Sequence, residues 1–235
     1  RKYKAGAFLA YFQSYTNTWA EPAELRGCFD EALAVADVVG LAVGTRPDCL
    51  APEVLDLLAD YHRSTYFWLE LGLQSIHDRT LEFIRRGHDY RTFLTAFSAA
   101  KECGLRVCVH VILGLPGEDR AMMLATAAAM ARLRVDGIKV HLLHVIEGTP
   151  LARLFREGGV KILDQEEYVA LAVDFLERLH PATLIHRLTG DGPREQLLAP
   201  LWSLRKWEVI NAIHDEFKRR DSRQGALCAA NDVAP

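Results

Sequence analysis

Several polar or glycine residues that could bind a ligand stand where apolar, strand-like runs end. They are Gln13, Arg46, Gln74, Gly114 and His141. In a barrel of parallel strands, the carboxyl ends of the strands share one face, and active sites lie there. We therefore expect these residues to gather at the barrel mouth. His141 could face a substrate, although a lone histidine is more often a satisfied core residue.

The strand-like runs have two unequal faces, because alternate residues of a strand point to opposite sides. Near residue 110, the apolar face holds Val107, Val109, Val111 and Leu113, and the other face holds Cys108, His110, Ile112 and Gly114. The run near residue 70 places Glu70 on the same face as Gln74. A sheet covered on both faces would be apolar on both, so the pattern favours a barrel whose interior opens into a site. We expect Gln13, Glu70, Gln74, His110 and His141 to share one cavity.

Two further groups of polar residues leave alternatives open. Arg46 and Asp48 could form a structural ion pair at the barrel mouth or contact a ligand. His141 and His144 fall on opposite faces of their strand, so they are a poor pair for one metal ion.

The five cysteines do not form a recognisable metal or disulfide pattern. An odd number of cysteines scattered through 235 residues argues against a disulfide scaffold and for a reducing compartment. Cys103 and Cys108 are the nearest pair, and no third cysteine stands at a usable spacing. We predict no metal ligands within this chain.

The elements that must position these residues alternate between strands and helices. Strands are predicted at 7–15, 38–45, 66–74, 106–113, 138–145 and 184–188, and helices at 22–36, 52–62, 77–86, 90–103, 120–134, 164–179 and 201–220. Such alternation implies right-handed crossovers and a parallel sheet.

The predicted fold class is α/β, a partial (β/α)6 TIM-type barrel with parallel strands and a C-terminal α-rich extension. We place the barrel at residues 1–155 and the extension at 156–235, with a disordered tail from about residue 222. A doubly wound open sheet is the alternative fold.

Composition excludes some classes of protein. No apolar run reaches the roughly 18 residues that span a bilayer, and the first residues do not lead into a signal peptide. We expect a cytoplasmic protein without a membrane partner. The net charge of −3 gives no global electrostatic reason to expect nucleic acid.

Six segments together resemble the radical S-adenosylmethionine (SAM) enzymes. They are YFQSYTNT (11–18), GTRPD (44–48), ELGLQS (70–75), HVILGLPGE (110–118), KVHLLHVIEGTPL (139–151) and IHRLTGDGPRE (185–195). The likeness is to the branch shared by the elongator catalytic subunit, the tRNA methylthiotransferases and oxygen-independent coproporphyrinogen oxidase, and above all to an uncharacterised bacterial subfamily of that branch. It implies two cofactors, SAM and a [4Fe-4S] cluster, with a reducing electron donor, and a 5′-deoxyadenosyl radical that acts on an unknown substrate.

The resemblance also implies roles for residues that would bind SAM. Gln13 and Ser14 would hold its amino end, unless they are ordinary strand-end residues. Glu70 and Gln74 match positions that line the SAM site. Arg86 would reach the SAM carboxylate, or else be a cation that offsets the dipole at a helix end.

The strand near residue 110 would meet the nucleoside part of SAM. His110 stands where relatives often carry an aspartate that binds the ribose. Ile112 would pack on the adenine, and Gly114 and Gly117 would let the backbone approach it, although a plain strand-to-helix turn would use the same residues. The residues that could face a substrate are Arg46, Asp48, His141, Arg187 and Asp191, and the last two could instead cap a loop.

The CxxxCxxC loop that binds the cluster in this family is missing from the sequence. Because the chain starts at what would be the second barrel strand, we expect the cluster ligands upstream of Arg1. The main hypothesis is therefore that the chain is the core of a radical SAM enzyme. The sequence that precedes Arg1 would test this hypothesis best. The alternative is a non-catalytic SAM-binding or interaction module that lacks the cluster. An acid-base enzyme using Glu70 and His110 is disfavoured, because no nucleophile is evident.

The net charge and the domain content bear on the class of substrate. Relatives in this branch often modify RNA, but the net charge is −3 and no RNA-binding domain is recognisable. We expect a small molecule or a protein side chain rather than tRNA.

Overall fold

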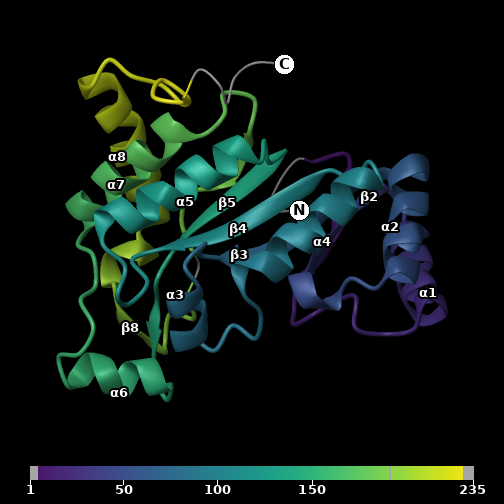
Figure 1. Cartoon of the computed structure of the whole chain (residues 1–235), viewed down its shortest axis with the longest axis horizontal. Coiled ribbons are helices and arrows are strands. Elements are labelled where there is room, and N and C mark those ends of the chain that lie inside the picture. Colours follow the sequence, from purple (N-terminus) through teal and green to yellow (C-terminus); the bar gives the residue numbers. More distant parts are fainter. Residues whose placement is uncertain (1–4, 191, 230–235) are drawn as a thin grey trace. The chain divides into compact units, whose positions relative to one another are not determined.

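The structure is a computed structural model that describes residues 5–190 and 192–229 (Figure 1). Six strands form one sheet: β1 (Phe8–Phe12), β2 (Val38–Thr45), β3 (Tyr66–Gln74), β4 (Val107–Leu113), β5 (Gly137–Leu142) and β7 (Leu184–Arg187). They are hydrogen-bonded in the order β1-β2-β3-β4-β5-β7. A doubly wound sheet reverses its strand order at a switch point, whereas here the order follows the chain. The predicted partial (β/α)6 barrel class is therefore confirmed, and the doubly wound alternative is wrong.

Helices separate most of the strands. They are α1 (Pro22–Leu33), α2 (Pro52–Ser64), α3 (Asp78–Phe83), α4 (Tyr90–Glu102), α5 (Arg120–Arg132), α6 (Pro150–Arg156), α7 (Gln165–Arg178) and α8 (Lys206–Arg219). The sequence pattern does not predict α6 or the small antiparallel sheet made by β6 (Val145–Ile146) and β8 (Leu197–Ala199). Among the described residues, no helix combines the length and the apolar character needed to cross a membrane.

The chain divides into two compact units. The first unit comprises Arg1–Leu73 and Gly87–Val109, and the second comprises Gln74–Arg86 and His110–Pro235. The boundary near residue 155 that the sequence suggests is a different division, and it stays a prediction.

The first unit builds its core from strands β1 to β3 and the helices beside them. Strand β2 pairs in parallel with β1 on one side and with β3 on the other. Helices α1 and α2 each begin with a proline, whose fixed φ suits a first helical turn. Phe29 of α1 lies edge-to-face against Phe12 at 5.0 Å and against Tyr61 at 5.4 Å, so aromatic contacts join both helices to the sheet.

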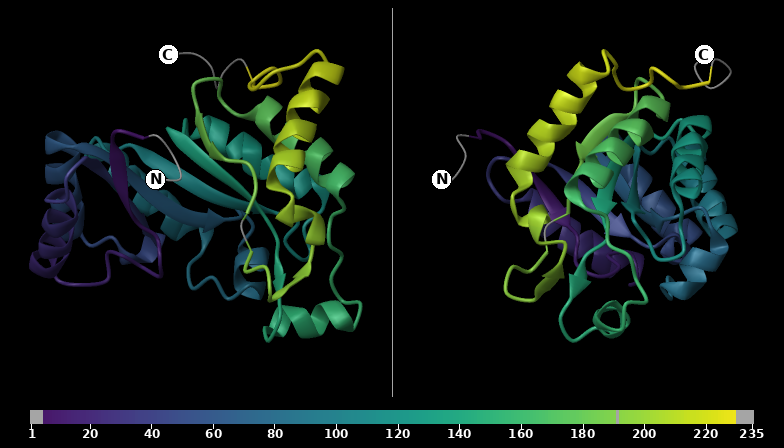
Figure 2. Two further views of the ribbon diagram at one scale, coloured as in Figure 1. Left: turned by 180° about the vertical axis from the view of Figure 1, so that it is seen from behind. Right: turned by 90° about the vertical axis from the view of Figure 1, so that its left-hand side faces the viewer.

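The second unit contains a layer of three helices. Helices α5, α7 and α8 lie side by side in Figure 1, and α7 and α8 do so again in Figure 2. Helix α7 begins with a capping box between Asp164 and Glu167, and it buries Tyr168 completely. The Tyr168 hydroxyl donates a hydrogen bond to the Leu188 carbonyl at 2.7 Å, which ties the helix to the end of β7.

Several elements end earlier than the sequence predicts, among them α1, α5 and β5, and for two others the structure shows the reason. Strand β1 stops at Phe12 rather than at residue 15, because the Asn17 side-chain amide donates to the carbonyls of Phe12 and Gly44 and turns the chain. Helix α3 stops at Phe83 rather than at residue 86, because Arg85 adopts a positive φ of 51° that no α-helix allows.

The ordered chain extends beyond residue 222, where we expected a disordered tail. The Gln224 amide donates to the carbonyls of His180, Pro181 and Thr183, and the Leu227 amide bonds the Glu177 carbonyl. Residues 230–235 lie outside the described residues.

Two buried carboxylates on α7 share an arginine at the end of α8. Asp174 and Glu177 are almost fully buried, and Arg220 lies 2.8 Å from the first and 3.3 Å from the second. Arg220 also binds Glu216 at 2.7 Å, and Arg120 of α5 pairs with Asp174. Removing one member of a buried ion group leaves uncompensated charge in a poorly solvated place.

We expect the substitution Arg220→Met to lower the free energy of unfolding by about 3–5 kcal/mol, because it leaves the buried Glu177 without its cation and Asp174 with Arg120 alone. Arg219→Met is the matched control: Arg219 also pairs with Glu216, but its side chain is 71% exposed, so a loss of less than about 1 kcal/mol is expected. Urea denaturation followed by circular dichroism measures both. Equal losses in the two variants would contradict this account.

Candidate functional site

The buried carboxylate of Glu70 is the central polar group of the first unit. Glu70 is 3% exposed, and the Tyr11 hydroxyl donates to its Oε2 atom at 2.7 Å. Tyr11 is opposite Ala42 on β2, and Glu70 is opposite Gly44 on the same strand. Paired residues of a parallel sheet point to one face, so only small side chains stand between the hydroxyl and the carboxylate. This face of the first unit can therefore hold an oriented acceptor for a ligand.

Gln13 and Ser14 follow the end of β1, and both are exposed. The Gly44 position lies against this turn, where an added Cβ would come within 3.2 Å of the Phe12 carbonyl oxygen. Backbone and small polar groups are thus presented at the carboxyl end of β1. Their role toward SAM stays a prediction.

Arg46 and Asp48 form a bidentate ion pair after the end of β2. The Arg46 Nε and Nη2 atoms lie 2.9 Å and 2.6 Å from the two carboxylate oxygens of Asp48. Burial raises the pKa of Asp48, but the hydrogen bonds and charge of Arg46 outweigh it and hold that pKa below its ordinary value. Arg46 also lies against Gly87, whose φ of 84° requires a residue without a side chain. The structure thus forms the ion pair, and contact with a ligand stays a prediction.

His110 and His141 come together in the second unit. Their rings have centroids 5.4 Å apart and an interplanar angle of 44°, and both residues are half-buried. They come from β4 and β5, which are neighbours in the sheet. Strand alternation predicted this proximity correctly for the pair.

The loop after β4 contains two glycines in the left-handed region of backbone conformation. Gly114 and Gly117 both have φ of 83°, a region that side chains disfavour. Gly117 has open space where a Cβ would stand, whereas a Cβ on Gly114 would meet Leu163 at 3.2 Å. The glycine at 114 is therefore also explained by packing alone. Ile112, just before the loop, is half-buried.

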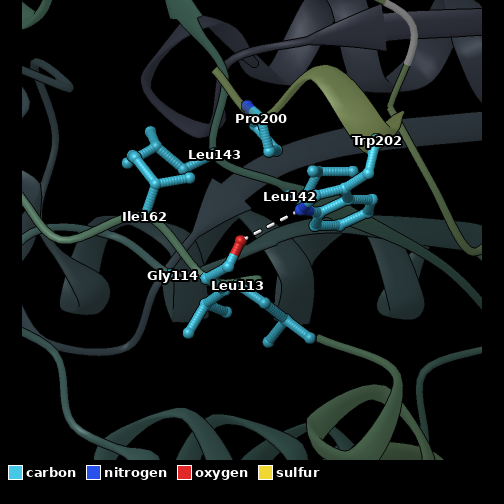
Figure 3. A pocket seen from close by; sticks show the side chains of 8 residues that line it. Leu113, Gly114, Leu142, Leu143, Ile162, Pro200 and Trp202 are labelled. Atoms are coloured by element: carbon cyan, nitrogen blue, oxygen red, sulfur yellow. Dashed lines mark hydrogen bonds between the residues drawn. The ribbon is translucent and has the colours of Figure 1, made fainter. Parts of the chain in front are cut away.

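A small apolar cavity of about 10 Å³ lies behind Gly114 (Figure 3). Leu142, Leu143 and Trp202 line it, and the Trp202 indole donates to the Leu163 carbonyl at 3.1 Å. A volume of this size holds about one water molecule, so the cavity supports the loop and cannot hold an organic ligand.

Glu118 anchors the same loop to the segment that follows β3. The Ser75 hydroxyl donates to Glu118 Oε1, and the His77 amide donates to Ser75 Oγ at 3.0 Å. Burial raises the pKa of Glu118 above its ordinary value, although hydrogen bonds from Ser75 and Thr80 act in the opposite direction. Gln74 precedes Ser75 with a strained φ of 80°. This contact gives the glycine loop a fixed position within the second unit.

Arg86 lies after the end of α3, where its backbone amide bonds the Leu81 carbonyl at 2.9 Å. It is half-buried, as is Arg187, which stands opposite Lys139 in the pairing of β7 with β5. Asp191 lies outside the described residues. The roles of Arg86 and Arg187 stay predictions.

Sequence reasoning did not assign two residues that the structure makes prominent, Tyr11 and Glu118. Tyr11 stands two positions before Gln13, so alternation could have placed it on the predicted face. Glu118 is the last residue of the segment HVILGLPGE. No local pattern predicts its hydrogen-bond partner Ser75, which is 43 residues away. The shared cavity expected for Gln13, Glu70, Gln74, His110 and His141 involves both units and stays a prediction.

The cysteines do not match the ligand set of an iron-sulfur cluster. All five are free, and their exposure ranges from buried Cys108 to exposed Cys28. No three cysteines gather within the part of the chain that the structure describes. Three thiolates are needed to hold such a cluster, so these cysteines do not fit one.

Two family models match successive parts of the chain. The model described as "Radical SAM superfamily" matches residues 18–130, and the model described as "Radical_SAM C-terminal domain" matches residues 135–219. Together they cover the strands that carry Glu70, His110 and His141.

Several curated proteins are similar along nearly the whole chain. The uncharacterised protein YtqA of Bacillus subtilis is 48% identical over 95% of this chain and 70% of its own length. The protein YhcC of Escherichia coli is 43% identical over 95% of this chain and 72% of its own length. The elongator complex protein 3 of Schizosaccharomyces pombe is 28% identical over 80% of this chain and 37% of its own length.

A solved structure has a similar fold. Elp3 of the archaeon Methanocaldococcus infernus, with residues 1–46 deleted, matches with a TM-score of 0.77 at 19% identity. The match covers 91% of this chain, which spans about half (54%) of the Elp3 chain. With the two family models and the extended likeness to YtqA, this shows that the chain belongs to the radical SAM superfamily.

Proposed function

We propose that this chain is the core of a radical SAM enzyme that binds SAM at the carboxyl ends of its strands. The observation that carries the proposal is the match of both family models across those strands. A structure with a similar fold, SuiB of Streptococcus suis, holds SAM itself, with a TM-score of 0.55 over 77% of this chain. The [4Fe-4S] cluster would be held by residues other than the cysteines of this chain.

The residues of this chain suit a ligand that is cationic at one end and nucleoside-like at the other. When bound, SAM supplies a carbon–sulfur bond whose reductive cleavage yields the 5′-deoxyadenosyl radical. Glu70, held in place by Tyr11, offers an oriented acceptor for an ammonium group. Arg86 offers a bidentate partner for a carboxylate. The glycine loop at 114–117 offers backbone groups to a flat ring.

The first test of this function is binding of S-adenosylhomocysteine, which needs neither reductant nor cluster. We expect Arg86→Gln to weaken binding about tenfold or more, because one charge-assisted contact to the carboxylate is lost. Arg86→Lys should bind with intermediate affinity, because it keeps the charge and loses the fork. Isothermal titration calorimetry measures all three affinities.

Arg79→Gln is the matched control for this titration. Arg79 is an exposed residue of α3, the short helix that precedes Arg86. Its substitution should therefore leave the affinity unchanged. If Arg86→Gln binds S-adenosylhomocysteine as tightly as the control does, the assignment of Arg86 is wrong. No binding to the unmodified chain would refute the SAM site itself.

The second test concerns the cluster. We expect anaerobic reconstitution of this chain with iron and sulfide to give no stable cluster absorbance, because its thiolates do not converge. Binding of about four irons per chain together with SAM cleavage would refute our account of the cysteines. The full-length protein distinguishes the enzyme from the alternative, a non-catalytic SAM-binding module: only the enzyme would cleave SAM once reduced.

The substrate that we favour is a small molecule or a protein side chain. The tRNA uridine(34) acetyltransferase of Methanocaldococcus jannaschii is 30% identical, but over only 57% of this chain and 25% of its own length. The net charge of −3 does not favour a polyanion. Charge therefore supports a substrate other than tRNA, although the name of this one relative includes it.

Titration of the full-length protein with bulk tRNA at two salt concentrations tests this preference. We expect affinity weaker than about 100 µM at physiological salt, in the range of non-specific binding. Micromolar affinity that falls steeply with salt, as several neutralised phosphates require, would restore tRNA as the substrate.

A further inference from the structure

The second unit holds an apolar cavity of about 550 Å³, which adjoins the proposed SAM contacts through Ile112 and through Leu115 and Pro116 of the glycine loop. Phe83 and Ile84 at the end of α3 line it, together with Leu115 of the loop after β4 and Leu154 of α6. Small-molecule sites commonly measure about 300–1,000 Å³ and are mostly apolar. The cavity thus has the size and lining of a site for an organic ligand.

Helix α6 forms a stable wall for this cavity. Thr149 caps the helix by accepting a hydrogen bond from the Ala152 amide, and Pro150 occupies its first turn. Ala152 packs against Val145 and Ala199. That packing leaves Leu154 on the side of the helix that lines the cavity. The wall therefore has its own hydrophobic support and does not depend on a ligand.

Arg85 is the only charged residue among the described residues that line the cavity. Its side chain is exposed, and the structure gives it no ion pair with any described residue. Its φ of 51° belongs to the left-handed turn that ends α3, in which the Arg86 amide bonds the Leu81 carbonyl, so the backbone of Arg85 is fixed at the edge of the cavity. One unpaired cation at the edge of an apolar cavity is complementary to one anionic group on an apolar body.

We propose that this cavity binds a small amphipathic anion, with its apolar body against Phe83, Ile84 and Leu154 and its anionic group paired with Arg85. The anionic group is a carboxylate, sulfonate or phosphate, each of which pairs with a guanidinium in the same way. The inference rests on the proposed function and deepens it by naming the class of substrate. A single cation and a cavity of this volume favour a small molecule over an RNA or a protein segment.

Two fluorescent probes that differ in one charged group test the proposal on the chain itself. Anilinonaphthalene sulfonate has an aromatic body and a sulfonate, and phenylnaphthylamine has the same body without the charge. We expect each to bind once per chain and to compete with the other. Arg85→Gln should weaken binding of the sulfonate about threefold to tenfold, because an exposed charge-assisted contact is lost, and leave the neutral probe unchanged.

Two variants control for non-specific binding. Arg153→Gln removes the same charge from the exposed side of α6, away from the cavity, and should change neither affinity. Leu154→Glu places a carboxylate in the lining and should weaken both probes, the sulfonate more strongly. Circular dichroism checks that Leu154→Glu folds. If it does not fold, Leu154→Ala replaces it. This second variant only removes apolar contact and should weaken binding of both probes equally.

Three outcomes would overturn the proposal. The first is a sulfonate affinity that Arg85→Gln leaves unchanged or that Arg153→Gln lowers equally. The second is probe binding that no substitution of Leu154 affects. The third is displacement of phenylnaphthylamine by S-adenosylhomocysteine, which would assign the cavity to SAM. Because the Arg86 titration measures SAM binding separately, failure of this proposal and failure of the proposed function are distinguishable.

Discussion

A carboxylate buried in the middle of a strand is the constraint on which the polar face of the first unit depends. Glu70 is nearly inaccessible, and an unpaired buried charge is costly, so the structure must supply it with a donor. Tyr11 does so from β1, two strands away from Glu70 in the sheet. The contact requires small residues on the strand between them, and Ala42 and Gly44 stand there. One polar contact thus explains the residue types on three adjacent strands.

In the second unit, buried polar groups are compensated by ion pairs and by hydrogen bonds that hold a loop in place. Arg220 compensates Asp174 and Glu177 between α7 and α8, so the helix layer is held by charges as well as by apolar packing. The loop that follows β4 is anchored by Glu118 on Ser75, and its glycines adopt backbone angles that other residues avoid. Strands β4 and β5 therefore carry His110 and His141, while the backbone groups of the glycine loop follow β4 and are anchored through Glu118.

Membership of the radical SAM superfamily and the cysteine content of the chain have different consequences. The family models, the relatives and the fold all concern the half-barrel of parallel strands. The cysteines concern the reductive chemistry, and within the described part of the chain they do not converge. The division is chemically reasonable, because in such enzymes the cofactors carry the difficult step and the protein supplies binding and orientation. An apolar cavity with one cation at its edge fits that supporting role.

The sequence by itself determined the features that depend on local periodicity. All six sheet strands were predicted close to their observed bounds, and the apolar set Val107, Val109 and Val111 is fully buried, because alternation along a strand is a property of neighbouring residues. The order of the sheet followed from the same alternation of strands and helices, since short crossovers place successive parallel strands side by side. His110 and His141 met for that reason.

Only the tertiary structure decided the features whose partners are distant in the chain. The Asn17 amide ends β1 by bonding a carbonyl 27 residues away, and Arg220 reaches Asp174 across 46 residues. The pairing of Tyr11 with Glu70 and of Ser75 with Glu118 likewise joins separate elements, as does the lining of the cavity beside Arg85. No local pattern encodes such contacts, because their free energy depends on burial and on the approach of groups that are brought together only when the chain folds.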